Sequence, residues 1–142
     1  MTTVPKYFRF PKESTICILN YNSQIDESTV LSLRQTLKKV GFNTVSYPNA
    51  TKAIYYKGKP SIKYKNDEIE EILSIKDFNS IYELRMTFKD DAIKGYPTEV
   101  KVNVVDMNTK QIVLYYTCGS EKSIKAVLNK FVLKLSEKIS KY

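Results

Sequence analysis

The residues of this sequence with the most evident capacity for chemistry are lysines and tyrosines gathered in one stretch. Aromatic rings can stack on nucleic-acid bases while lysine ammonium groups contact phosphates, and tyrosine is also enriched at protein–protein interfaces. A solvated loop held by one or two tyrosines would have the same composition. The candidate partner-binding residues, which all lie between Asn49 and Asn66, are Lys52, Tyr55, Tyr56, Lys57, Lys59, Lys63, Tyr64 and Lys65.

The rest of the sequence offers no recognisable catalytic or metal-binding pattern. It contains no histidine, which excludes serine–histidine and cysteine–histidine catalysis and histidine metal sites. Its 4 glycines are isolated from one another, so neither a P-loop nor a dinucleotide-binding fingerprint is present. The acidic run from Asp67 to Glu71 suits the positive end of a helix dipole. We therefore expect no catalytic residues, no metal and no cofactor, and a protein that is not an enzyme.

The two cysteines, Cys17 and Cys118, each lie in an apolar run typical of a strand. They are too few for a four-ligand zinc site, and they permit one disulfide at most. We expect two buried free thiols, with a single bridge as the alternative.

Length and charge indicate one basic globular domain. The chain has 142 residues, of which 42% are hydrophobic, and a net charge of +8. Only Arg9, Arg34 and Arg85 are arginines, and bidentate recognition of bases or phosphates favours arginine over lysine. The lysine excess therefore favours solubility or a diffuse acidic partner over sequence-specific reading of nucleic acid. No segment approaches the roughly 18 consecutive apolar residues of a membrane helix.

The first half of the chain reads as an extended lead-in over residues 1–13 followed by a strand–helix–strand unit. Residues 14–21 are apolar on both faces, which is typical of a central strand. A helix over 26–40 begins at the N-cap Asp26 and ends before Gly41, a residue type favoured at helix C-caps. A short strand over 42–47 follows. We expect residues 49–66 to be irregular and a second helix to begin at Asp67.

The second half predicts three strands and a helix. Residues 81–89 alternate between apolar and polar, as in a strand with one buried and one solvent-exposed face. Strands over 99–106 and 111–118 should form a hairpin, and a final amphipathic helix should begin after the N-cap Ser120. Its lysine-rich face could bind a membrane surface, but packing of its apolar face on the core is favoured.

Together these elements predict the fold class: an α/β (α+β) single layered domain over residues 1–142. We expect a mixed sheet of about five strands, in the order β-α-β-α-β-β-β-α, with the helices packed on the sheet.

Three segments resemble a group of bacterial cell-envelope domains in pattern. They are the run Thr15–Tyr21, the helix end Leu37–Phe42 and the hairpin Val104–Tyr116. The group includes the amino-terminal domain of TolB, the lipoproteins that activate penicillin-binding proteins and the curli-secretion lipoprotein. This chain departs from the group in its Lys/Tyr stretch and in having no cysteine for lipidation near Met1, and no functional residue is carried over. The resemblance implies a non-catalytic periplasmic domain, often lipid-anchored, that binds protein partners.

The sequence thus leaves three functions open. The first is a non-catalytic protein-binding or assembly domain of the bacterial cell envelope. It would lie in the periplasm or at the outer membrane if an export signal belongs before Met1, and in the cytoplasm otherwise. The alternative is a cytoplasmic nucleic-acid-binding module that uses the Lys/Tyr stretch, and the third is a small-molecule enzyme.

Overall fold

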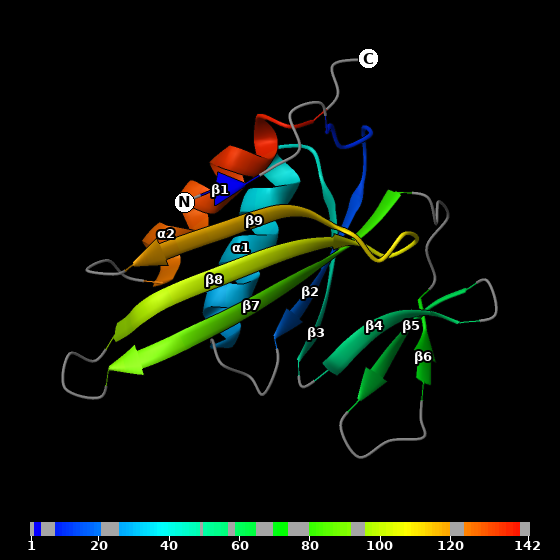
Figure 1. Ribbon diagram of the computed structural model, residues 1–142, viewed down its shortest axis with the longest axis horizontal. Helices are drawn as coiled ribbons and strands as arrows, with labels where there is room; N and C mark the ends of the chain where they lie inside the picture. The colour runs from blue at the N-terminus through cyan, green and yellow to red at the C-terminus, as the bar shows by residue number, and fades with distance from the viewer. Residues whose placement is uncertain are drawn as a thin grey trace.

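The structure is a computed structural model that describes residues 2–3, 8–20, 26–48, 50–56, 59–64, 70–73, 80–91, 96–119 and 124–139. Two sheets and a layer of two helices make up this part of the chain (Figure 1). The strands are β1 (Thr2–Thr3), β2 (Thr15–Asn20), β3 (Asn43–Pro48), β4 (Ala50–Tyr56), β5 (Lys59–Tyr64), β6 (Glu70–Ile72), β7 (Ile81–Asp91), β8 (Tyr96–Asp106) and β9 (Ile112–Gly119). The helices are α1 (Glu27–Lys39) and α2 (Ile124–Ser136).

The large sheet is mixed and has the order β1-β9-β8-β7-β2-β3. Strand β2 pairs in parallel with both β3 and β7, whereas β7, β8 and β9 are antiparallel. The expected fold class is therefore confirmed: a mixed sheet with helices packed on it. The interior strand β2, which lies between β3 and β7, is buried on both faces, as its continuous apolar run predicts.

Helix α1 begins and ends as the sequence predicts. The carboxylate of Asp26 accepts a hydrogen bond from the Thr29 amide at 2.8 Å, which satisfies a free N–H of the first turn. At the other end, the amide of Gly41 donates to Lys38 and that of Phe42 donates to Leu37. These two bonds form a Schellman motif. It requires the positive φ of 109° that Gly41 adopts.

The hairpin of β8 and β9 is also confirmed. Its turn is held by the Asp106 carboxylate, which accepts hydrogen bonds from the amides of Asn108 at 2.8 Å and Thr109 at 3.2 Å. The short side chain of aspartate favours such turns because it can bond the backbone two residues ahead. Strand β7 then pairs along the whole length of β8.

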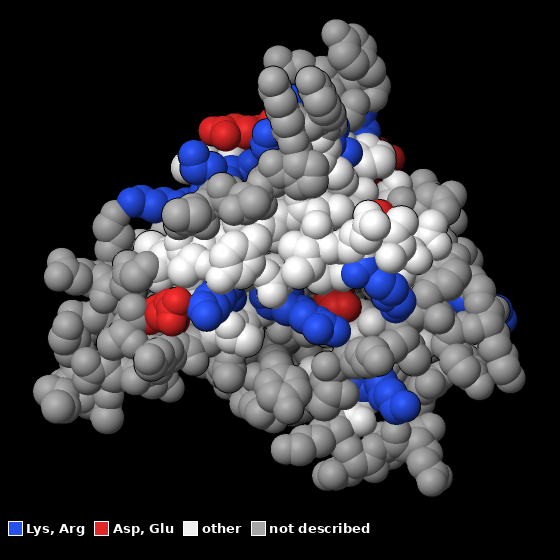
Figure 2. Space-filling model, in the orientation of Figure 1, with Lys and Arg blue, Asp and Glu red and all other residues white. Residues whose placement is uncertain are grey.

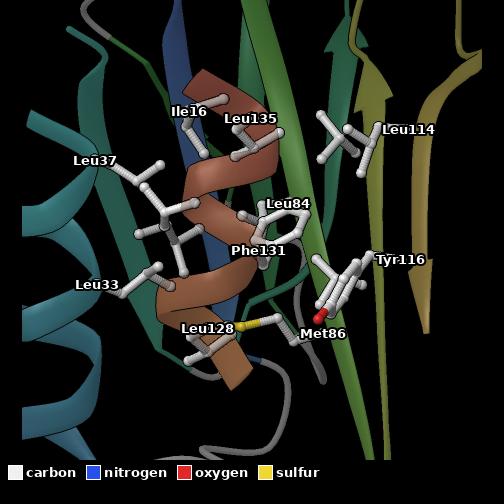
Figure 3. Packing of buried hydrophobic residues seen from close by; sticks show 14 of the residues in the cluster. Ile16, Leu33, Leu37, Leu84, Met86, Leu114, Tyr116, Leu128, Phe131 and Leu135 are labelled. Carbon is white, nitrogen blue, oxygen red and sulfur yellow. The ribbon is translucent and has the colours of Figure 1, made fainter. Parts of the chain in front are cut away.

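The main core lies between the helices and one face of the large sheet. Phe131 of α2 packs against Tyr116 of β9, with ring centroids 5.6 Å apart. Figure 3 shows Leu128 and Phe131 of α2 directed toward Leu84 and Met86 of β7. The predicted apolar face of α2 is therefore the face that covers the sheet. Its expected N-cap, Ser120, lies outside the described residues.

Part of the lead-in, over residues 8–10, is a component of the core. Phe10 is fully buried, and its amide donates a hydrogen bond to the Lys138 carbonyl at 2.7 Å. The Phe10 ring meets the rings of Phe8, Phe42 and Tyr82 edge to face, with centroids 4.8–5.3 Å apart. Ahead of it, β1 pairs with β9 at the edge of the large sheet.

The prediction for residues 49–66 and for a helix from Asp67 is wrong in the described residues. Strands β4, β5 and β6 form a three-stranded antiparallel sheet there. The apolar, β-branched and aromatic residues of β4 favour a strand, and Pro60 is tolerated near the start of β5. Glu70 of the acidic run is the register partner of Lys63, so strand pairing replaces the expected helix. Asp67 itself lies outside the described residues.

A second core joins the two sheets. Cys17 and Leu19 of β2 and Ile81 of β7 are buried against Ala53 and Ile62 of the small sheet. The small sheet thus covers the face of the large sheet that is opposite the helices, over β3, β2 and the beginning of β7.

Candidate binding surface

The structure places most of the Lys/Tyr candidates on one hairpin. Lys52, Tyr55 and Tyr56 belong to β4 and Lys59, Lys63 and Tyr64 to β5, while Lys57 and Lys65 lie outside the described residues. Strand pairing makes Lys52 the register partner of Lys63 and Tyr56 that of Lys59.

The hairpin presents lysines more clearly than aromatic rings. Lys59 and Lys63 are exposed, and because they are four residues apart on one strand they lie on the same face. Tyr64 is half-buried and packs against the second core. Tyr64 is the one tyrosine of the stretch whose side chain the structure describes. Because part of its ring packs against the protein, less of the ring is free to stack on a base.

A second surface, which the sequence does not single out, lies on the large sheet. Beyond the beginning of β7, which the small sheet covers, the face of β7, β8 and β9 that points away from the helices has no described element over it (Figure 1). Alternate residues of three adjacent strands form rows across this face, and we call them the outer sheet surface. The rows are Glu83–Val105–Ile112, Arg85–Asn103–Tyr115 and Thr87–Lys101–Thr117.

The charges of the outer sheet surface are paired with one another. The Arg85 Nε donates to the Glu83 carboxylate, and the Lys101 Nζ lies 3.7 Å from the Oε1 of Glu99. Figure 2 shows charged side chains in a row beneath an uncharged band that lies over β9. In these two pairs, two cations lie beside two carboxylates, and Glu99 adjoins the defined rows on β8.

Glu83 is buried, although the alternating pattern of β7 predicts that this face of the strand is exposed to solvent. Its side chain is only 3% exposed, whereas that of Arg85 is 47% exposed. The small sheet covers this end of the strand, and Cys17 of β2 is the register partner of Glu83. A buried carboxylate needs a charged or hydrogen-bonded partner, and Arg85 supplies one.

The two thiols are free, as expected, and neither is available for a bridge. Cys17 faces the second core and is fully buried, whereas Cys118 is half-buried beside the main core. They therefore lie on opposite faces of the large sheet. Burial raises the pKa of the Cys17 thiol, and the negative charge of Glu83 raises it further. A protonated, enclosed thiol is a poor nucleophile.

Other kinds of site have little support in the described part of the chain. No group of three or more histidine, cysteine or carboxylate side chains is placed there to hold a metal ion. Neither of the two described helices has the length and apolar character required to cross a bilayer.

The sequence contained one signal for the outer sheet surface. Arg85 and Tyr115 belong to residue types enriched at protein interfaces, and each occupies a polar or half-buried position of an alternating strand. The order of β7, β8 and β9 is needed to bring them into one row.

Comparison with known proteins gives matches in structure alone. No protein-family model matches the sequence, and no curated protein matches it. The chain is similar to a single-residue variant of the PelC dodecamer from Paraburkholderia phytofirmans, with 10% sequence identity and a TM-score of 0.45 over 99% of this chain and 97% of that one. It is also similar to the PelC dodecamer from the same organism in another crystal form, with 14% identity and a TM-score of 0.44 over 99% of this chain and 100% of that one.

Proposed function

We propose that this chain is a non-catalytic protein-binding or assembly domain that binds its partner on the outer sheet surface. The observation that carries the proposal is the face of β7, β8 and β9 beyond the end that the small sheet covers, where no described element lies over the strands and where Arg85 and Lys101 each lie beside a carboxylate. Antiparallel sheets often leave one face to solvent, so the composition of the face has to supply the argument for binding.

That composition resembles a protein interface. The central row combines Arg85, Asn103 and Tyr115, and Arg and Tyr are enriched where proteins meet. Ile112, which is 55% exposed, adds apolar area beside this row.

The same surface is poorly suited to nucleic acid. Binding to phosphates depends on an excess of cations that displace counterions, whereas Arg85 and Lys101 each have a carboxylate within reach. The rival nucleic-acid surface remains the hairpin of β4 and β5, where Lys59 and Lys63 are exposed.

The proposal includes the bacterial cell envelope as the place of action. Its support is the pattern resemblance of Thr15–Tyr21 and Val104–Tyr116 to envelope domains. Both segments contribute strands of the large sheet, β2 for the first and β8 and β9 for the second. Fractionation of the producing cells tests this part, and recovery of the protein in the cytoplasm alone would contradict it.

Site-specific photo-cross-linking tests the binding surface. A photoreactive phenylalanine analogue replaces Tyr115 on the outer sheet surface or, as the matched control, Lys134 on the exposed side of α2. We expect a discrete protein adduct from position 115 alone. Asn103→Arg, which adds bulk next to that position, should abolish the adduct without loss of folding. Equal adducts from both positions, or none from position 115, would overturn the proposal.

Nucleic-acid binding is tested separately with a single-stranded oligonucleotide. Under the proposal, any binding at low salt disappears near physiological salt, because lysines that only attract phosphates are screened. Micromolar or tighter binding at physiological salt that is lost in Tyr55→Ala would support the nucleic-acid function instead.

A further inference from the structure

The outward sides of the two helices form a second surface, on the opposite side of the large sheet from the outer sheet surface. We call it the helix-layer surface. Residues 26–40 and 124–139, which contain both helices, carry 7 lysines and arginines against 3 aspartates and glutamates. This excess of four positive charges is half the net charge of the protein, which is +8. On the outer sheet surface, in contrast, Arg85 and Lys101 each lie beside a carboxylate.

The cations gather where the two helices end. Gly41, just past α1, lies against the side chain of Ile139, just past α2, and both helices run toward the same end of the molecule (Figure 1). Figure 2 shows blue side chains along the upper edge of the molecule, where α2 lies in Figure 1. The exposed or half-exposed cations of this end are Arg9, Lys12, Lys38, Lys39, Lys134 and Lys138.

Helix dipoles account for only part of this arrangement. Lysines in the last turn stabilise the negative end of a helix, which explains Lys38, Lys39 and Lys134. The dipole does not explain the exposed Lys125 in the first turn of α2, nor the two exposed leucines of the layer. Leu31 of α1 is 52% exposed and Leu133 of α2 is 62% exposed.

We propose that the helix-layer surface binds an anionic phospholipid bilayer. Helices that lie in the plane of a membrane combine lysines, which attract anionic headgroups, with apolar side chains that enter the interface. Leu31 and Leu133 supply the apolar contact, and the surrounding lysines supply the charge. This inference does not depend on the proposed function, because it concerns a different face of the molecule.

Nucleic acid is the rival occupant, and the side chains of this surface favour lipid. Tight binding of single strands relies on aromatic rings that stack on bases. Among the described residues of α1 and α2, the one aromatic side chain is Phe131, which is fully buried in the core. Exposed leucines would meet the polar backbone of a nucleic acid without any gain.

Vesicle sedimentation tests the charge contribution. We expect the protein to sediment with vesicles of phosphatidylglycerol and phosphatidylcholine and to remain in solution with phosphatidylcholine alone. Lys38→Gln combined with Lys134→Gln should weaken binding about 30-fold, since each lysine near an anionic surface contributes about 5-fold. The matched control, Lys59→Gln with Lys63→Gln, removes the same charge from β5 and should change binding less than about 2-fold, because distant charges are screened.

Tryptophan fluorescence tests the apolar contribution. The protein has no tryptophan, so Leu133→Trp introduces a single reporter on the helix layer and Ile112→Trp a matched one on the outer sheet surface. Anionic vesicles should shift the emission of Trp at position 133 to the blue and leave that at position 112 unchanged. Equal sedimentation of the wild-type protein with the two kinds of vesicle would overturn the proposal. So would equal losses of binding in the helix-layer double variant and in the β5 double variant. Displacement of the protein from vesicles by a single-stranded oligonucleotide would identify nucleic acid as the preferred occupant and also overturn it.

Discussion

Replacing Phe10 with alanine should destabilise the whole domain, although Phe10 precedes the first long strand. Its side chain is fully buried and meets three other rings with centroids 4.8–5.3 Å apart. Truncation of a buried phenylalanine costs about 3–5 kcal/mol, and each edge-to-face ring pair contributes about 0.5–1.5 kcal/mol beyond its buried area. We therefore expect a loss near the upper end, about 4–5 kcal/mol. The backbone hydrogen bond from Phe10 to Lys138 remains in the variant, so the loss reports the ring alone.

Urea unfolding followed by circular dichroism measures this loss. Single domains are usually stable by about 5–15 kcal/mol, so the variant should fold but unfold at a much lower urea concentration. Two substitutions calibrate the result. Phe10→Leu, which keeps most of the volume, should cost far less than Phe10→Ala, and Leu133→Ala on the exposed helix surface should cost less than about 0.5 kcal/mol. A loss below about 1 kcal/mol for Phe10→Ala would show that the ring is not part of the cooperative core.

Three further predictions follow from single residues. Gly41→Ala should destabilise the protein by about 1–2 kcal/mol in thermal unfolding, because an L side chain is strained at positive φ, even though the nearest atom to the added carbon is 3.9 Å away. An unchanged melting temperature would contradict this. A thiol reagent should modify Cys17 only after unfolding, since the thiol is buried and its pKa is raised; the Cys118→Ser variant isolates that signal, and fast native labelling would refute it. Burial and the nearby Asp106 carboxylate raise the pKa of Tyr82 from 10.0 to about 12. The protonated phenol therefore contributes its full share of stability below the pKa of the unfolded protein, 10.0. This contribution is lost as the pH rises from there through about 12. In urea unfolding, the free energy of unfolding of Tyr82→Phe should fall less between pH 10 and 12 than that of the wild type. An identical fall in both proteins would contradict this prediction.

The parts of the fold that the sequence predicts well are those encoded by neighbouring residues. Asp26 and Gly41 mark the two ends of α1, because capping requires particular side chains at fixed positions. The turn held by Asp106 and the apolar stripe of α2 are local in the same sense. The pairing of β2 with β3 follows from the helix between them.

The parts that could not be predicted depend on contacts between distant residues. Acidic residues such as Glu70 and Glu71 suit the first turn of a helix, yet here they pair with β5, and pairing overrides the local preference. The burial of Glu83 has the same origin, because it depends on the small sheet that covers one end of β7. The candidate binding surface also differs from the predicted one, because it too depends on contacts between distant residues. The Lys/Tyr stretch is a visible pattern in one segment, whereas the row of Arg85, Asn103 and Tyr115 exists only after three strands have aligned.

The position of β2 between β3 and β7 in the large sheet has a consequence for the order in which the chain folds. Its partner β7 is far along the chain, with Thr15 paired to Ile81, so this pairing must close a long loop before any of its contacts are gained. The hairpins of β7, β8 and β9 close short loops and can form early. The small sheet, which lies within the long loop, brings the ends of that loop closer once it forms. We therefore expect β2 and β7 to pair last. The rate of folding should then depend on the closure of the long loop between them and not on the strength of the core.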